Sequence, residues 1–209
     1  MKTNMVDFWV RYIEGFFKQY IFGDMYNDIE TAMQGGAKHL VPLGILVYIE
    51  VLGGFVTGLL GVEGKGRDRF ESFLFDYMGR KYKDEETQRG LDIYDDVRCG
   101  LVHYYFTKRP PYVTSASIMK YEYAGCRCGI NIEYVVKDGV KERAVIIVVE
   151  RLFSDFKAGV DKYYKKLIVD RNEELIGKFA QALGKTFSLS GRSKALNALF
   201  TESKGKNSS

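Results

Sequence analysis

Apolar side chains recur at intervals of three and four residues between Met5 and about Met33. This spacing places them on one face of a helix. The pattern therefore predicts one or two amphipathic helices, which end where Gly35 and Gly36 follow. The apolar face consists of Trp9, Tyr12, Ile13, Phe16, Phe17 and Tyr20.

The most hydrophobic part of the chain extends from Leu40 to Leu60 and is about long enough to span a bilayer. Glu50 lies at its midpoint, where a carboxylate costs about 2.5–3.5 kcal/mol on membrane-insertion scales. Four glycines also make this segment a poor helix unless neighbouring elements pack closely against it. We expect a buried central helix in which Glu50 has a partner, and the alternative is a membrane span.

Two further helices are expected before the middle of the chain. The first extends from Asp68 to about Lys81, after a glycine-rich loop (61–67) that lacks the spacing of a phosphate-binding loop. The second begins at Asp84, which is a good N-cap residue and is followed by two glutamates in the first turn. It can extend to Lys108, because Pro110 and Pro111 then end it.

The pattern changes to strands after the two prolines. Segments 117–123, 128–136 and 143–149 favour strand, and the last of these is continuously apolar between Val145 and Val149, as expected of a central strand. Asp138-Gly139 is a strong signal for a tight turn between two antiparallel strands. Helical patterns return from Glu150 to about Val169 and from Glu173 to about Leu183.

These elements predict an α+β fold that is mainly α, a helical bundle with a small antiparallel β-sheet inserted before the last helices. We expect a single domain over residues 1–184, with the β insertion at about 115–149. Residues 185–209 are expected to form a basic, partly disordered C-terminal tail.

Composition and charge indicate an ordinary globular protein. Hydrophobic residues make up 46% and charged residues 28% of the chain, which excludes a disordered chain. The net charge of +4 comes from the tail, where residues 185–209 contain five Lys or Arg and one Glu. A basic tail attracts nucleic acid without specificity, but the body of the protein is neutral, so charge alone does not indicate a shaped site.

Cysteine and histidine usage limits the possible chemistry. The three cysteines are an odd number and follow no secretory leader, which favours a cytoplasmic location and free thiols. His39 and His103 are the two histidines, which excludes most metal and triad sites. Cys126 and Cys128 have neither a second cysteine pair nor a nearby histidine to complete a zinc site. We therefore expect no metal and no cofactor.

One segment combines residues that could carry chemistry. Arg98 is followed after four residues by His103, and Tyr105 comes two residues later. This pattern resembles the HEPN superfamily, whose signature is an Arg, four to six residues and a His late in a helical bundle. The context is similar to a group of uncharacterised prokaryotic HEPN-like proteins. The resemblance covers roughly residues 40–110.

The resemblance implies a metal-independent endoribonuclease that forms a homodimer with its cleft between two copies of the motif. It also implies a minimal nucleotidyltransferase antitoxin as a possible partner, with Tyr105 as a site of adenylylation. RNA supplies its own nucleophile, the 2′-OH. His103 could then act as the base and Arg98 could stabilise the charge on the phosphorane. Lys108 and Arg109 could attract the phosphates, and Glu50 and Tyr94 would support the site.

A non-catalytic interpretation explains the same residues. Arg98 could be the counter-ion of Glu50 or Asp95, and His103 a packing residue. On a regular helix Arg98 and His103 are separated by about 140°, so they converge only if the helix is distorted near Gly100 or if a second protomer supplies one of them. The alternative function is therefore a non-catalytic HEPN-like dimerisation or nucleotide/RNA-binding module, without a membrane partner.

Overall fold

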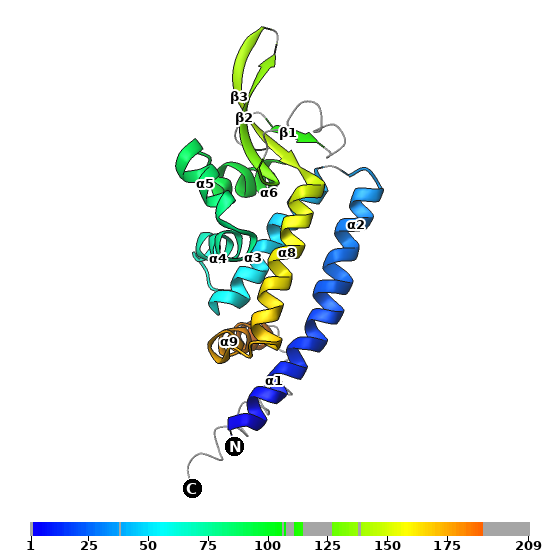
Figure 1. The fold of residues 1–209 in the computed structure, drawn as a ribbon, viewed down its shortest axis with the longest axis vertical. Coiled ribbons are helices and arrows are strands. Elements are labelled where there is room, and N and C mark those ends of the chain that lie inside the picture. The colour runs from blue at the N-terminus through cyan, green and yellow to red at the C-terminus, as the bar shows by residue number, and fades with distance from the viewer. Residues whose placement is uncertain are drawn as a thin grey trace.

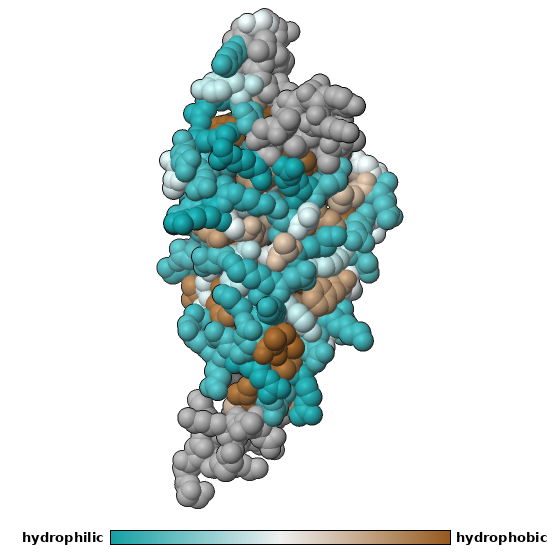
Figure 2. Space-filling view, in the orientation of Figure 1, coloured by the Kyte–Doolittle hydropathy of each residue, from teal (hydrophilic) through white to brown (hydrophobic). Residues whose placement is uncertain are grey.

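The structure is a computed structural model of the 209-residue chain and describes residues 2–37, 39–105, 107, 111–114, 127–137 and 139–189. It is an elongated helical body with a small sheet at one end (Figure 1). One hydrophobic core runs through the body, from Val10 in the first helix to Leu183 in the last. The face shown in Figure 2 is largely hydrophilic, and hydrophobic side chains gather there only in small separate patches.

The N-terminal segment forms one continuous helical rod along the edge of the body (Figure 1). It consists of α1 (Lys2–Phe16), η1 (Phe17–Met25), which is π-helical, and α2 (Tyr26–Gln34). The predicted amphipathic helix is found, because Ile13 and Phe17 of the predicted apolar face are buried, but Tyr20 of that face is exposed. The rod ends at Gly35 and Gly36, and Gly36 has the positive φ of 71° that favours glycine.

The predicted buried central helix is confirmed as α3 (Leu40–Thr57). It is long and apolar enough to cross a membrane, but most of it is buried inside the protein, which is typical of a core helix. Gly53 explains how closely α4 (Gly66–Phe73) approaches it. A Cβ atom at Gly53 would lie 1.7 Å from the carbonyl oxygen of Arg69, so only glycine permits this contact.

The predicted single helix from Asp84 to Lys108 is wrong. The chain instead forms α5 (Arg80–Arg89), η3 (Ile93–Cys99), which is π-helical, and α6 (Gly100–Tyr104). Gly90 ends α5 with a φ of 65°. Asp92 then caps η3, since its carboxylate accepts the backbone N–H of Asp95 at 2.8 Å. A glycine and a capping residue close together therefore outweigh the helical periodicity on either side.

The helix predicted over Asp68–Lys81 is found, with a different end. It begins as α4 and continues as the π-helical η2 (Leu74–Met78). Gly79 then breaks the chain with a φ of 119°, two residues before the expected end at about Lys81. Asp84 lies inside α5 and is not its N-cap, because α5 begins directly after Gly79.

The sheet has three strands in the order β1-β3-β2. The predicted antiparallel pair is confirmed as β2 (Ile130–Lys137) and β3 (Val140–Val148), while the strand expected at 117–123 lies outside the described residues. β1 (Pro111–Thr114) was not expected and pairs with β3 in parallel, so the sheet is mixed. Pro111 is compatible with this position because it is the first residue of an edge strand.

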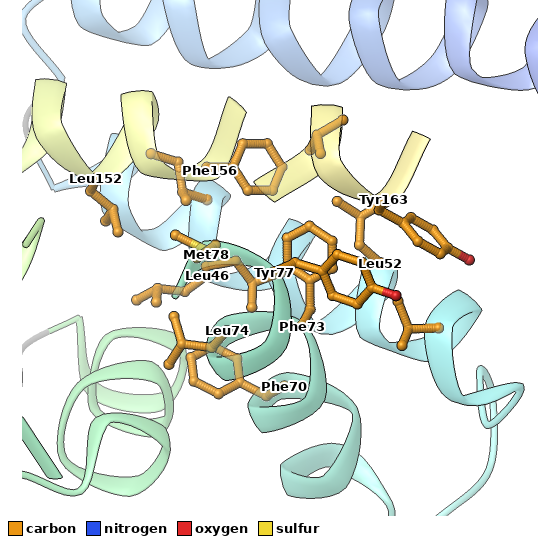
Figure 3. Packing of buried hydrophobic residues seen from close by; sticks show 14 of the residues in the cluster. Leu46, Leu52, Phe70, Phe73, Leu74, Tyr77, Met78, Leu152, Phe156 and Tyr163 are labelled. Carbon is orange, nitrogen blue, oxygen red and sulfur yellow. The ribbon is translucent and has the colours of Figure 1, made fainter. Parts of the chain in front are cut away.

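Two helices complete the fold after the sheet. They are α8 (Val149–Ile168) and α9 (Glu173–Leu189), so residues 185–189 of the expected tail belong to a helix. Side chains of α4 and η2 fill the space between α3 and α8 (Figure 3). Burying each such aromatic or aliphatic side chain contributes roughly 1.5–3 kcal/mol. The packed residues include Leu46, Leu52, Phe70, Phe73, Leu74, Tyr77, Met78, Leu152, Phe156 and Tyr163.

Candidate functional site

A cluster of three charged side chains lies where α3, α4 and η3 meet. Oε1 of Glu50 is 2.6 Å from Nη2 of Arg69, and Oε2 is 2.5 Å from Nη2 of Arg98. The three side chains are only 12%, 14% and 16% exposed in that order. Glu50 therefore has the partner that its burial requires, and one carboxylate serves two guanidinium groups.

The sequence analysis did not identify Arg69 as a partner of Glu50. The pattern of apolar residues assigns Arg69 to a helix but does not show which way its side chain points. Arg69 is held from both sides, since its Nη1 also donates to the carbonyl oxygens of Leu59 at 3.3 Å and Val62 at 2.7 Å. Two signals could have identified this pair: Glu50 is a buried carboxylate on one helix, and Arg69 is an arginine on the next helix. Arg69 thus ties the loop after α3 to the charged cluster.

Tyr94 covers this cluster on the η3 side. Its ring centroid is 5.5 Å from the Arg98 guanidinium and 4.8 Å from that of Arg67. Gly66 permits the approach, because a Cβ atom there would lie 2.3 Å from the Tyr94 hydroxyl. Burial raises the pKa of Tyr94 against the lowering effect of Arg98, so the phenol stays protonated and acts as a packing and cation–π partner.

His103 lies on a different side of its helix from Arg98. Leu101 is buried, and two residues correspond to about 200° of rotation, so the exposed His103 points away from the core. Its one aromatic neighbour among the described residues is Tyr104, at 6.4 Å between ring centroids. The distortion expected near Gly100 is present as the π-helical η3, but no hydrogen bond joins Arg98 to His103. Within one chain the two motif residues do not converge.

Tyr105 ends α6 in a left-handed conformation, with a φ of 64°. This conformation costs a non-glycine residue roughly 1–2 kcal/mol. The ring stacks on His39 at the start of α3, with centroids 5.4 Å apart and planes 28° from parallel. The stack joins the end of α6 to the beginning of α3, a role for His39 that the sequence gave no reason to expect.

These contacts fix the direction of η3 and α6 relative to α3. Arg98 lies beside Glu50, just past the middle of α3, and Tyr105 lies beside His39 at its start. The η3–α6 segment therefore runs antiparallel to α3. Val102 lies four residues after Arg98 and three before Tyr105, which places it on the flank of α6 that faces α3.

The outward stripe of α3 beside this flank is apolar. Helical spacing places Leu40, Leu43, Val47 and Val51 on one side of α3. Leu40 is 51% exposed, Val47 36% and Val102 of α6 37%, while the other two are partly buried. Surface helices normally present polar side chains to water. We call these residues the α3–α6 strip: Leu40, Leu43, Val47, Val51, Val102 and Tyr105.

The remaining candidates do not add a metal or nucleophile site. Lys108, Arg109 and Cys126 lie outside the described residues. Within the described part of the chain, no group of three His, Cys, Asp or Glu side chains could hold a metal ion. Burial raises the pKa of the Cys128 thiol to about 12, and its sulfur contacts the carbonyl oxygen of Ile130. Cys128 is therefore an inert core residue.

Comparisons of this chain with protein-family models, with curated proteins and with solved structures each find no match. The HEPN-like resemblance therefore depends on the residues from Glu50 to Tyr105 described above.

Proposed function

We propose that this chain is a dimer-forming helical module of the HEPN-like type, in which the α3–α6 strip is the contact surface between two copies. The observation that supports this function is the apolar outward stripe of α3, at Leu40, Leu43, Val47 and Val51. A core helix that turns an uncharged stripe to solvent next to a second exposed valine, Val102, favours a protein interface.

A second copy fits the strip because of its shape and its surroundings. Two antiparallel helices contribute to it, so a two-fold axis can pack the strip of one copy against the same strip of the other. The charged groups at its borders are already engaged: Glu50 with two arginines, and Asp28 as the acceptor of the Tyr48 hydroxyl. Membrane-surface helices instead carry Lys and Arg beside the apolar face.

The oligomeric state of paired charge-insertion variants tests this function. We expect the wild-type chain to elute and scatter light as a dimer at micromolar concentration. Val47→Asp combined with Val102→Asp should give a folded monomer, because a buried unpaired carboxylate opposes association. Val169→Asp is the matched control, since Val169 is exposed at the end of α8 outside the strip. A wild-type monomer, or a dimer that survives both strip substitutions, contradicts the proposal.

A second candidate function is metal-independent cleavage of RNA at the dimer cleft. The exposed imidazole of His103 favours it, while the ion pair of Arg98 with Glu50 holds the guanidinium in place. Since the two residues diverge within one chain, the cleft would take Arg98 from one copy and His103 from the other. This function depends on the dimer.

The reaction needs no external nucleophile. His103 would remove the proton of the RNA 2′-OH, the 2′-oxygen would attack phosphorus, and the bond from phosphorus to the 5′-oxygen would break. Arg98 would stabilise the charge that develops on the phosphorane. The leaving oxygen then takes a proton from water, which leaves a 2′,3′-cyclic phosphate and a 5′-hydroxyl. Cleavage in EDTA that is lost in His103→Gln, with the fold retained, is the expected result, and undiminished cleavage rejects this function.

A further inference from the structure

The outer half of the β2–β3 hairpin has a surface that neither the dimer nor the Arg98–His103 segment uses. The hairpin projects beyond the helical body at the sheet end of the molecule (Figure 1). On the face of the hairpin that enters the core, Ile132 pairs with Val145, and both are buried. The next pair outward on the same face is Tyr134 with Arg143. This face of the hairpin therefore changes from buried core to solvent-exposed surface between one residue pair and the next.

Tyr134 is the exposed centre of this surface. Its side chain is 61% exposed, which is unusual for a residue that follows a core position on the same strand face. Nζ of Lys141 lies 4.6 Å from the centroid of its ring. Arg143 is the cross-strand partner of Tyr134 on the same face of the hairpin and is exposed. An exposed aromatic ring thus lies beside two cations of the neighbouring strand.

The two cations have no carboxylate partner among the described side chains. Arg143 donates through Nη2 to the backbone carbonyl oxygen of Arg89, which fixes its direction without neutralising its charge. The nearby acid Glu133 is engaged by Arg89, at 2.9 Å. The charge of Lys141 and Arg143 therefore stays available for an anion.

We propose that Tyr134, Lys141 and Arg143 form a contact surface for single-stranded RNA. An exposed aromatic ring can stack on a base of any identity, and flanking cations can contact the phosphates on either side of that base. Paired strands keep their base faces inside the duplex, so the same surface cannot stack on them. This inference does not depend on dimerisation, and it supplies a substrate class for the second candidate function.

Fluorescence anisotropy with the full-length chain tests the surface. The probe is a labelled oligoadenylate of about twelve nucleotides, a length within the range that one such surface covers. Tyr134→Ala should weaken binding by about tenfold, whereas Tyr134→Phe keeps the ring and should bind as the wild type does. Tyr20→Ala removes another exposed tyrosine, in η1, and is the matched control. The basic tail is present in every variant, so its contribution cancels.

Salt dependence tests the two cations separately. Lys141→Gln and Arg143→Gln should each reduce the slope of log affinity against log salt by about one, because each removes one phosphate contact. Lys165→Gln, at an exposed position of α8, should leave the slope unchanged. Equal binding by Tyr134→Ala and wild type overturns the inference. Equal binding of duplex RNA or of polyglutamate also overturns it, since the surface would then attract any polyanion. None of these outcomes bears on the dimer proposal, which is tested only by the variant that combines Val47→Asp with Val102→Asp.

Discussion

The Glu50 carboxylate of α3 and the Arg98 guanidinium of η3 form an ion pair with 2.5 Å between Oε2 and Nη2. Arg69 shares the same carboxylate through Oε1. The cluster is therefore asymmetric, because loss of the single acid leaves two buried cations while loss of either arginine leaves a neutral pair. The stability of variants at Glu50 and Arg98 can therefore measure the structural role of Arg98 separately from any role in catalysis.

Glu50→Gln is expected to lower the free energy of unfolding by about 3–5 kcal/mol, because two mostly buried guanidinium groups then lack a counter-charge. Arg98→Met should cost clearly less, since the Glu50–Arg69 pair persists and the methionine chain can fill the space. Urea denaturation of both variants measures the difference. Glu174→Gln removes an exposed pair with Lys178 and should leave stability unchanged. Equal losses in Glu50→Gln and Arg98→Met would show that the two arginines do not share the charge.

Much of this cluster follows from the sequence. A carboxylate in the middle of an apolar helix must have a partner, and the sequence offers Arg98 as the counter-ion of either Glu50 or Asp95. The sequence does not reveal Arg69, because periodicity assigns it to a helix without giving the direction from which that helix crosses α3. The crossing depends on the contact at Gly53, which is a property of the packed pair.

The breaks in the predicted long helix have a different origin. Periodicity on both sides of Gly90 favours one helix, but the left-handed backbone at Gly90 and the cap at Asp92 interrupt it. The parallel pairing of β1 with β3 is likewise a long-range contact, and a four-residue strand carries too little pattern to predict it. The stack of Tyr105 on His39 joins two helix ends that are far apart in sequence, so no local signal could indicate it.

Gly53→Ala is expected to be among the most destabilising single substitutions in α3. The added methyl group would lie 1.7 Å from the Arg69 carbonyl oxygen, and that oxygen is backbone, so α3 and α4 must separate. A loss of at least about 3 kcal/mol in the free energy of unfolding, measured in urea, is expected. Gly177→Ala in α9 is the control, because no atom lies within 4 Å of its added Cβ. The free energy of unfolding of Gly177→Ala should be higher than that of the wild type by about 0.5–1 kcal/mol. Similar stability of the two variants would contradict the close contact.

Glu86 should make the protein less stable as the pH rises. Burial raises the pKa of Glu86 from 4.5 to about 6 in the folded protein, although its Oε1 accepts the backbone N–H of Ile93. The folded state therefore binds the proton more tightly than the unfolded state, so this contribution to stability is present below pH 4.5 and is lost as the pH passes 6.

Glu86→Gln removes this titration and keeps an oxygen for Ile93. Urea denaturation at several pH values measures the free energy of unfolding of both proteins. The value for Glu86→Gln should rise relative to that of the wild type between pH 4.5 and a pH somewhat above 6, with no further change at higher pH. Because the side chain is partly exposed, the gain should be about 1 kcal/mol after solvent screening. Glu63→Gln, at an exposed position in the loop after α3, is a comparison for general charge effects, since Glu63 is not among the charges that act on Glu86. A difference that is constant with pH would contradict the raised pKa.

Arg98→Ala and His103→Gln are each expected to abolish RNA cleavage as pure dimers, yet a mixture of the two should recover it. If each cleft takes Arg98 from one copy and His103 from the other, a mixed dimer contains one cleft with both wild-type residues. Random exchange makes about half of the dimers mixed, so about a quarter of wild-type activity should return. The same mixture built on the Val47→Asp, Val102→Asp background cannot dimerise and should stay inactive. No recovery, with mixed dimers demonstrated by differential tagging, would place both residues in one chain or remove them from catalysis.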